Sequence, residues 1–283
     1  MKKILLLTLA SGLCTAQSNM DVKYQPVVLD TSVQLIAPQR PQIKTFIPDT
    51  NSEQFKELRQ LARQKTIEDL VVSNTGLSPQ AVELAFDARS CALKHNQTKN
   101  SGNLTIIDFS RPSTEKRLFI VNPTTGDVLV KEWVAHGAKS GGVVPTDFSN
   151  VQESNKSSLG LIEPTFEFTS SKGRSVRLAG LYKGMNDKVF DREIIIHPSQ
   201  YIGNGKTGRS LGCPAVRTEA IDVVVNGVKG GLVYAYHQNY TAQLQEVLKP
   251  CQKPQLPESK LFAENTNLCP TNEVLDQQLM AAL

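Results

Sequence analysis

The sequence Glu193-Ile-Ile-Ile-His197 is an apolar run that ends in a histidine, and it predicts a buried strand. A glycine-rich loop follows and leads into Gly208-Arg-Ser-Leu-Gly-Cys213-Pro-Ala-Val-Arg217. His197 and Cys213 are sixteen positions apart in the sequence, so only a loop that folds back brings them together. A cysteine and a histidine joined in this way are the minimum for catalysis by a thiol nucleophile.

β-type runs fill most of the chain around this stretch. Six further runs, bounded by turn residues, predict strands at Leu104–Phe109, Arg117–Val121, Val128–Val134, Thr165–Thr169, Ser175–Leu178 and Leu232–Tyr236. Helical patterns are found at Ser52–Ser73, Ser78–His95 and Thr218–Val228. We therefore expect a mainly β fold with helices (α+β), in which a short helical segment precedes a β-rich domain.

The same patterns divide the chain into five parts. Residues 1–16 read as a signal peptide, and the proline-bearing residues 17–50 as an extended or disordered lead-in. A helical segment at 51–98, a β-rich domain at 99–240 and a C-terminal tail at 241–283 follow.

The N-terminus has the features of a secretory signal. Lys2-Lys3 is a positive start, and Ile4–Leu13 is an apolar core too short to anchor the chain across a membrane. Lipid attachment at Cys14 is the alternative, but Leu13 stands before it, where a small residue is expected. We expect cleavage after Ala16 and export across the inner membrane to a periplasm.

The net charge argues against a nucleic-acid partner. The 283-residue chain has a formal charge of +4, which falls to +2 without Lys2 and Lys3 (29 basic against 27 acidic residues). No later apolar run approaches the roughly 20 residues of a membrane span.

Export would give the cysteines a specific meaning, because an oxidising compartment favours disulfides. After cleavage four remain, namely Cys91, Cys213, Cys251 and Cys269. If Cys213 stays a free thiol, Cys251–Cys269 is the favoured bridge, closing a loop of about 18 residues for roughly 3 kcal/mol. The competing arrangement pairs Cys91 with one of the tail cysteines.

Neither a nucleotide cofactor nor a metal is expected. Gly203–Gly208 matches G-x-G-x-x-G, but it does not open a helix as a dinucleotide site requires. His136, His197 and Cys213 lack the close spacing typical of zinc ligands.

Each candidate catalytic residue also has a structural interpretation. Cys213 is either a nucleophile or a half-cystine, and His197 either its base or a satisfied histidine at the end of a core strand. As nucleophile and base they would form a thiolate–imidazolium pair. Ser210 and Gly212 lie in the loop whose backbone N–H groups would form an oxyanion hole, to which Pro214 has no N–H to contribute.

Several motifs occur together in an order that resembles one known family. They include Phe109-Ser-Arg-Pro-Ser113, Ala135-His-Gly137, Ile196-His197 and Gly208-Arg-Ser-Leu-Gly-Cys-Pro-Ala215. From about residue 75 to 240 the chain is similar to the murein L,D-transpeptidase catalytic-domain family, the second YkuD-type branch. The resemblance implies a YkuD-like catalytic domain over 99–240 and a cell-wall-associated enzyme acting on peptidoglycan stem peptides.

The resemblance also assigns roles to residues. Cys213 becomes the nucleophile and His197 its base, while His136, Arg209 and Arg217 become candidates for substrate binding. The implied reaction is L,D-transpeptidation through a Cys213 thioester. The alternatives are an L,D-carboxypeptidase or endopeptidase that hydrolyses the same intermediate, and a non-catalytic wall-binding module.

Two positions depart from the family pattern. Leu211 stands where better-studied members carry a histidine close to the nucleophile, and Pro198 follows the base where glycine is expected. The first puts a histidine beside Cys213 in doubt, with His136 as a possible substitute; the second predicts a stiffer backbone after the base.

Overall fold

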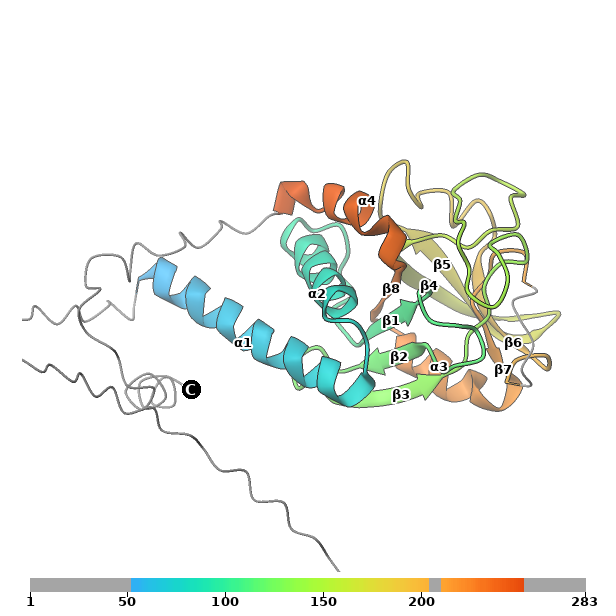
Figure 1. Ribbon diagram of the computed structural model, residues 1–283, viewed down its shortest axis with the longest axis horizontal. Helices are drawn as coiled ribbons and strands as arrows, with labels where there is room; N and C mark the ends of the chain where they lie inside the picture. The colour runs from blue at the N-terminus through green and yellow to red at the C-terminus, as the bar shows by residue number, and fades with distance from the viewer. Residues whose placement is uncertain (1–51, 204–209, 252–283) are drawn as a thin grey trace, which may run out of the picture. The chain divides into compact units, whose positions relative to one another are not determined.

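A single mixed sheet organises the computed structural model, which describes residues 52–203 and 210–251. Within these residues the sheet has eight strands in the order β3-β2-β1-β8-β4-β5-β6-β7 (Figure 1). The strands are β1 (Leu104–Asp108), β2 (Leu118–Val121), β3 (Val128–Glu132), β4 (Gly160–Ser170), β5 (Gly173–Gly180), β6 (Ile195–Ser199), β7 (Ala215–Arg217) and β8 (Leu232–Tyr236). Strand β8 pairs parallel to β1 and antiparallel to β4, and so joins the two halves of the sheet.

The strands confirm the α+β prediction, and most lie where the β-type runs indicated. The strand predicted to begin at Glu193 begins later, because β6 starts at Ile195 and Glu193 has a φ of 57°, which is not a strand conformation. At its other end β6 continues through His197 to Ser199, because the short strand β7 pairs with it in parallel. No separate sequence pattern predicts β7.

Helices α1 (Glu53–Thr75) and α2 (Pro79–Lys94) confirm the first two helical patterns. Ser78 caps α2 by accepting a hydrogen bond from the Ala81 N–H, and Pro79 occupies the first turn, where no N–H is needed. The third pattern forms η1 (Thr218–Ala220) and α3 (Ile221–Val228). Three short elements end the described chain: η2 (Gln238–Tyr240), α4 (Thr241–Glu246) and η3 (Lys249–Cys251).

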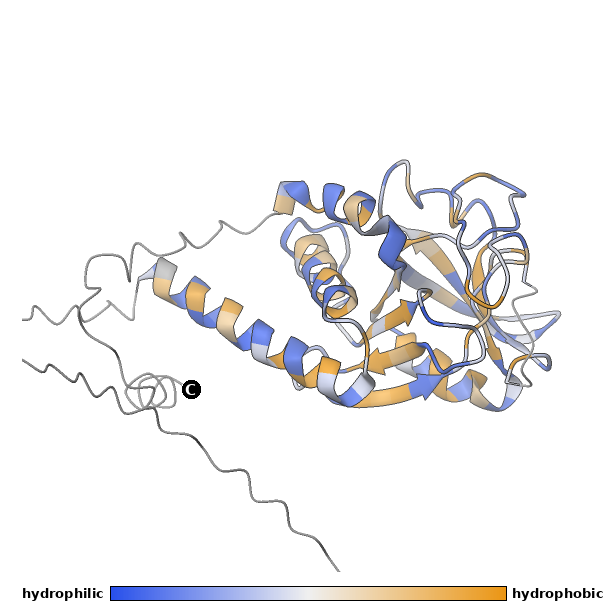
Figure 2. Cartoon of the chain, viewed as in Figure 1, coloured by the Kyte–Doolittle hydropathy of each residue, from blue (hydrophilic) through white to orange (hydrophobic). Residues whose placement is uncertain are grey.

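The two central helices lie against different strands. Helix α2 packs on β1, β4 and β8, and its apolar residues share one core with the strands. Helix α3 instead contacts β2 and β3 as well as β5 and β6, which lie in opposite halves of the sheet. The sheet is therefore curled. Figure 2 shows hydrophobic residues along β1 and β2, whereas α1 mixes hydrophobic with hydrophilic residues.

The curled sheet brings its two outer strands together. The Ala135 N–H, just after β3, donates to the Ala215 carbonyl of β7 at 2.8 Å. Glu132 at the end of β3 holds Arg217 at the end of β7 through two hydrogen bonds of 2.7 and 2.8 Å. These contacts fix β7, and hence the approach to Cys213, against the start of the His136 segment.

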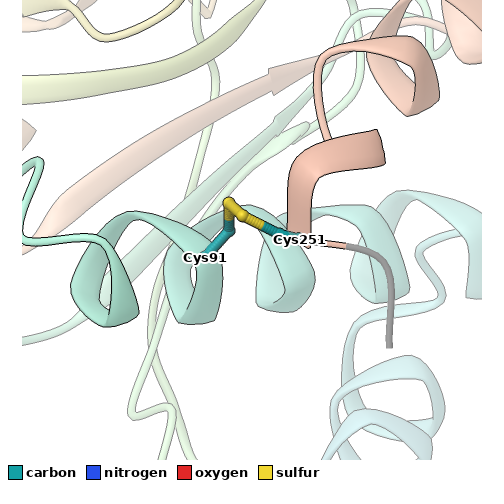
Figure 3. The surroundings of a disulfide bond; sticks show 2 residues. All are labelled: Cys91 and Cys251. Carbon is teal, nitrogen blue, oxygen red and sulfur yellow. A yellow bond between two sulfur atoms is a disulfide. The ribbon is translucent and has the colours of Figure 1, made fainter. Parts of the chain in front are cut away.

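The described disulfide joins Cys91 of α2 to Cys251 of η3 (Figure 3). The favoured Cys251–Cys269 pairing is therefore wrong, and the competing arrangement with Cys91 holds. The physical reason is that α4 runs back over α2 and brings the two Cα atoms to 5.5 Å, although 160 positions separate them in sequence.

Several sequence predictions lie outside the described residues. They concern the signal peptide, the lead-in to residue 50, Arg209, and the tail with Cys269. Among the helices that the structure describes, none combines the length and the apolar composition that crossing a bilayer requires. The domain limits stay a prediction.

Candidate active site

Strands β6 and β7 bring the two candidate catalytic residues into one neighbourhood. Their parallel register places His197 opposite Ala215, so that Cys213, two residues earlier, comes level with Ile195. The Ile195 backbone hydrogen-bonds the Cys213 thiol, so Cys213 lies against β6 two residues before His197. The pairing of β6 with β7 therefore brings the two residues near each other, as a cysteine–histidine pair requires.

Cys213 is a free, buried cysteine whose side chain is 8% exposed. Burial raises the pKa of its thiol, because a thiolate is poorly solvated there. The Ile195 backbone and the positive charges of Lys172, Arg192 and Arg177 lower the pKa, but by less than burial raises it. The surroundings of Cys213 thus favour its neutral thiol, and they also contain cations that would stabilise a negative charge formed nearby.

His197 is held in one tautomer by the residue that follows it. Its Nδ1 lies 2.9 Å from the Pro198 carbonyl oxygen, which only accepts hydrogen bonds, so Nδ1 carries the proton. Its Nε2 is then free to accept, and it lies 3.3 Å from the Lys172 ammonium. Pro198 thus orients the His197 imidazole through its carbonyl, a contact for which a glycine is not needed.

Both pKa shifts act against a charged pair in the free protein. Burial, and secondly the charge of Lys172, lower the pKa of His197, whereas burial raises that of Cys213. At neutral pH we therefore expect a thiol beside a neutral imidazole. These directions disfavour the expected thiolate–imidazolium pair in the free protein. If the two residues are catalytic, His197 would take the thiol proton as Cys213 attacks.

This assignment predicts how the alkylation of Cys213 depends on pH. Only the thiolate reacts, so the rate with iodoacetamide should rise through a midpoint above the ordinary thiol pKa of about 8.5. Peptide mass spectrometry at each pH separates the label on Cys213 from that on Cys269. A rate that is already maximal at pH 6 would indicate a preformed thiolate instead.

Gly212 shapes the loop before the nucleophile. Its φ of +122° is unfavourable for other residues, and a Cβ would lie 2.8 Å from the Lys156 carbonyl oxygen. Its N–H donates to Ser210 Oγ at 3.3 Å, and its carbonyl accepts from Ser157 Oγ at 3.4 Å. The Gly212 N–H is therefore already occupied, which leaves the Cys213 N–H as the donor we expect in an oxyanion hole.

Ser210 fixes the other end of this loop. Its carbonyl accepts from the Ala138 N–H at 2.7 Å, and it forms a parallel bridge with Gly137. A cavity of about 400 Å³ opens beside the loop. The described residues lining it are Lys172, His197, Pro198, Ser199, Gln200, Tyr201, Ser210, Leu211 and Thr218.

Comparison with known proteins identifies the domain that carries this arrangement. The profile of the L,D-transpeptidase catalytic domain family matches residues 73–236, more than half of the chain. The chain belongs to the L,D-transpeptidase catalytic domain family. No curated protein matches it.

Three solved structures illustrate how distant the similarities are. An L,D-transpeptidase from Mycobacterium smegmatis is 12% identical, with a TM-score of 0.31 over 47% of this chain and 58% of that one. A variant of the helical cell shape determining protein Pgp2 from Campylobacter jejuni is 12% identical, with a TM-score of 0.34 over 58% of this chain and 61% of that one. Bd1075 from Bdellovibrio bacteriovorus is 14% identical, with a TM-score of 0.33 over 53% of this chain and 55% of that one. The match thus spans less than two thirds of each of these proteins.

In this L,D-transpeptidase domain His136 has a structural position. It is 0% exposed, and its Nδ1 accepts from the Arg117 guanidinium at 2.7 Å. Burial, and secondly the charge of Arg117, lower the pKa of His136 to about 4, so it is neutral at pH 7. Its ring is enclosed by protein, and substrate binding by His136 stays a prediction.

Arg217 is likewise engaged within the domain. Besides its paired hydrogen bonds to Glu132, its guanidinium lies 4.9 Å from the Trp133 ring. The side chain also lines a second cavity of about 300 Å³, which shares Ser199 and Gln200 with the first. Its place in the fold is the contact between β3 and β7, and substrate binding by Arg217 stays a prediction.

Three cations that the structure describes near Cys213 were missed in the sequence, namely Lys172, Arg177 and Arg192. Arg192 is buried and donates to oxygens of Ser149, Ser154, Lys156 and Ser158, which fixes the loop facing Gly212. Lys172 lies in the turn between β4 and β5. The hairpin could be predicted from Ser170-Ser-Lys-Gly173, but no local pattern indicates that its tip reaches His197.

Proposed function

We propose that this member of the L,D-transpeptidase family is an exported enzyme that acylates Cys213 with a peptidoglycan stem peptide. The observation that supports the proposal is the β6–β7 pairing, which sets His197 opposite Ala215, two residues after the free Cys213. The tautomer of His197 leaves its Nε2 unprotonated and so able to act as a base. A thiol, a base and a carbonyl that orients the base are the parts that thiol acyl transfer needs.

The proposed reaction begins at the meso-diaminopimelate residue, the third residue of a donor tetrapeptide. Cys213 Sγ attacks its carbonyl carbon while His197 Nε2 takes the thiol proton, and a C–S bond forms. The C–N bond to the terminal D-alanine then breaks as Nε2 returns the proton to the leaving nitrogen. The products are a thioester on Cys213 and free D-alanine.

A second stem-peptide amine completes the transfer. It attacks the thioester carbonyl, gives a proton to His197, and displaces the Cys213 thiolate, which is reprotonated. The oxyanion of each tetrahedral intermediate is stabilised by the Cys213 N–H and by the nearby positive charges of Lys172, Arg177 and Arg192.

The disulfide supports the proposed export. Disulfides persist in oxidising compartments, and Cys91 of α2 is bonded to Cys251 of η3. Together with the signal-like N-terminus it favours a periplasmic, cell-wall-associated protein whose partners are peptidoglycan stem peptides.

Incubation of purified protein with peptidoglycan fragments tests the reaction. We expect dimers cross-linked between two third-position residues and free D-alanine, both lost in Cys213→Ala. Tripeptides without dimers would show that water resolves the thioester, making the protein an L,D-carboxypeptidase or endopeptidase. Unchanged substrate, with no Cys213 adduct in the intact-protein mass, would leave a non-catalytic wall-binding role.

A further inference from the structure

The tip of the β4–β5 hairpin is held firmly against the residue that follows the base. Gly173 has a φ of +112°, and a Cβ there would lie 3.2 Å from Pro198 Cγ, so the turn passes close to β6. Ser170 Oγ accepts from the Lys172 N–H at 3.1 Å and lies 2.9 Å from Ser175 Oγ. The β4–β5 turn, held by these hydrogen bonds and by its contact with Pro198, therefore places Lys172 next to His197.

Lys172 lines the cavity of about 400 Å³ beside Ser210. There its ammonium lies next to the His197 nitrogen that acts as the base in the proposed reaction. Its Nζ lies 3.3 Å from His197 Nε2, the nitrogen that would protonate the leaving group. Among the described residues that line this cavity, Lys172 is the only one with a permanent charge, and none is acidic. Among the described residues, an anion entering the cavity thus meets one cation and no carboxylate.

The other two described cations near Cys213, Arg192 and Arg177, interact with other groups of the protein. Arg192 donates to four oxygens of the Ser149–Ser158 loop. Arg177 lies 3.7 Å from Glu193 and 4.9 Å from the Phe190 ring. Of the cations that the structure describes around Cys213, Lys172 is therefore the one best placed to bind a substrate anion.

Covalent geometry indicates which anion this is. In an amino acid the nitrogen and the carboxylate carbon are both bonded to Cα, so a carboxylate oxygen lies within about 4 Å of the nitrogen. The leaving nitrogen must approach His197 Nε2 to about 3 Å to receive its proton. The carboxylate of the leaving residue then lies within reach of Lys172 Nζ, whereas a side-chain carboxylate of the preceding residue is several bonds farther away.

Resting on the proposed function, we propose that Lys172 binds the terminal carboxylate of the leaving residue and so selects donors that end at that residue. Binding would also draw the ammonium away from His197 Nε2. The base then becomes free to accept the Cys213 proton only when a correct donor is present. Lys172 acts in this way as a specificity-determining residue.

The test compares a tetrapeptide ending in a free carboxylate with the same peptide ending in an amide. Full-chain Cys213→Ser protein binds both without turnover, and calorimetry gives each Kd, while the ¹⁵N shift of His197 Nε2 reports loss of the ammonium. One charge-assisted hydrogen bond predicts that the acid binds about 10- to 100-fold tighter. A third peptide, amidated only on the diaminopimelate side chain, should keep the affinity of the acid.

Matched variants in the Cys213→Ser background assign the effect to one residue. Lys172→Met should remove the acid preference, and Lys172→Arg should retain part of it. Lys183→Met removes the same charge at an exposed position of the Leu181–Arg192 loop and should leave the preference unchanged. Equal binding of acid and amide, or a preference that survives Lys172→Met, would overturn the proposal. If affinity falls only when the diaminopimelate side chain is amidated, the cation binds that carboxylate and not the terminal one. This result would also refute the proposal.

Failure of the proposed function gives a different result. If the wild-type protein forms no thioester while the acid preference depends on Lys172, the anion site stands and the reaction does not. If the thioester forms but Lys172→Met keeps the preference, the reaction stands and the role of Lys172 does not.

Discussion

Replacing Cys213 by alanine is expected to abolish thioester formation and to slow release of D-alanine by at least about 10³-fold, since loss of a catalytic nucleophile typically costs that much or more. The change removes one buried sulfur and leaves the backbone undisturbed, so the free energy of unfolding should fall by only about 1 kcal/mol. Intact-protein mass spectrometry with a tetrapeptide donor measures the first effect, and urea unfolding followed by circular dichroism measures the second.

Two further variants sharpen this experiment. Cys213→Ser keeps nearly the same shape but offers a weaker nucleophile, so it should also be inactive. Val223→Ala shortens a side chain that is 51% exposed on α3 and should keep full activity. Product formation by Cys213→Ala at an unchanged rate would refute the assignment of the nucleophile.

Removing the Cys91–Cys251 disulfide is expected to be the largest change in stability. The bond spans 160 positions, for which the chain-entropy relation gives roughly 5 kcal/mol, and measured losses for native bridges run about 2–5 kcal/mol. Because 1 kcal/mol shifts the Tm of a domain of this size by about 2–4 °C, the double variant Cys91→Ser/Cys251→Ser should melt about 5–15 °C lower.

Reductant provides the control for this prediction. It should lower the Tm of the wild-type protein to that of the double variant and leave the double variant itself unchanged. A wild-type Tm that does not respond to complete reduction, verified by thiol counting, would mean that the bridge adds no stability. Cys213→Ala should respond like the wild type, because Cys213 takes no part in the bond.

Local sequence patterns predict most of the secondary structure. Alternating and continuous apolar runs predict strands such as Leu232–Tyr236, which β8 matches at both ends. Ser78-Pro79 predicts the start of α2 because a capping hydroxyl and a proline both suit a first turn. Motifs also single out His197 and Cys213 as candidates, since thiol catalysis limits which residue types serve as nucleophile and base.

Contacts between distant parts of the chain could not be predicted in this way. The pairing of Cys91 with Cys251 depends on how α4 crosses α2, and no spacing rule encodes that path. His136 appeared to be a site residue, yet the curled sheet buries it beside Arg117. Lys172 appears in the sequence as an ordinary turn residue, and only the packing of its hairpin on Pro198 brings it to the base.

The burial of Cys213 also bears on how long the protein stays active among oxidants. Thiolates, rather than thiols, attack disulfides and are converted to sulfenic acid. A thiol that is 8% exposed, with its pKa raised by burial, offers oxidants little of the reactive form and little access. The domain thus keeps its one free described cysteine chemically quiet under conditions that oxidise Cys91 and Cys251, at the expense of speed in the resting state.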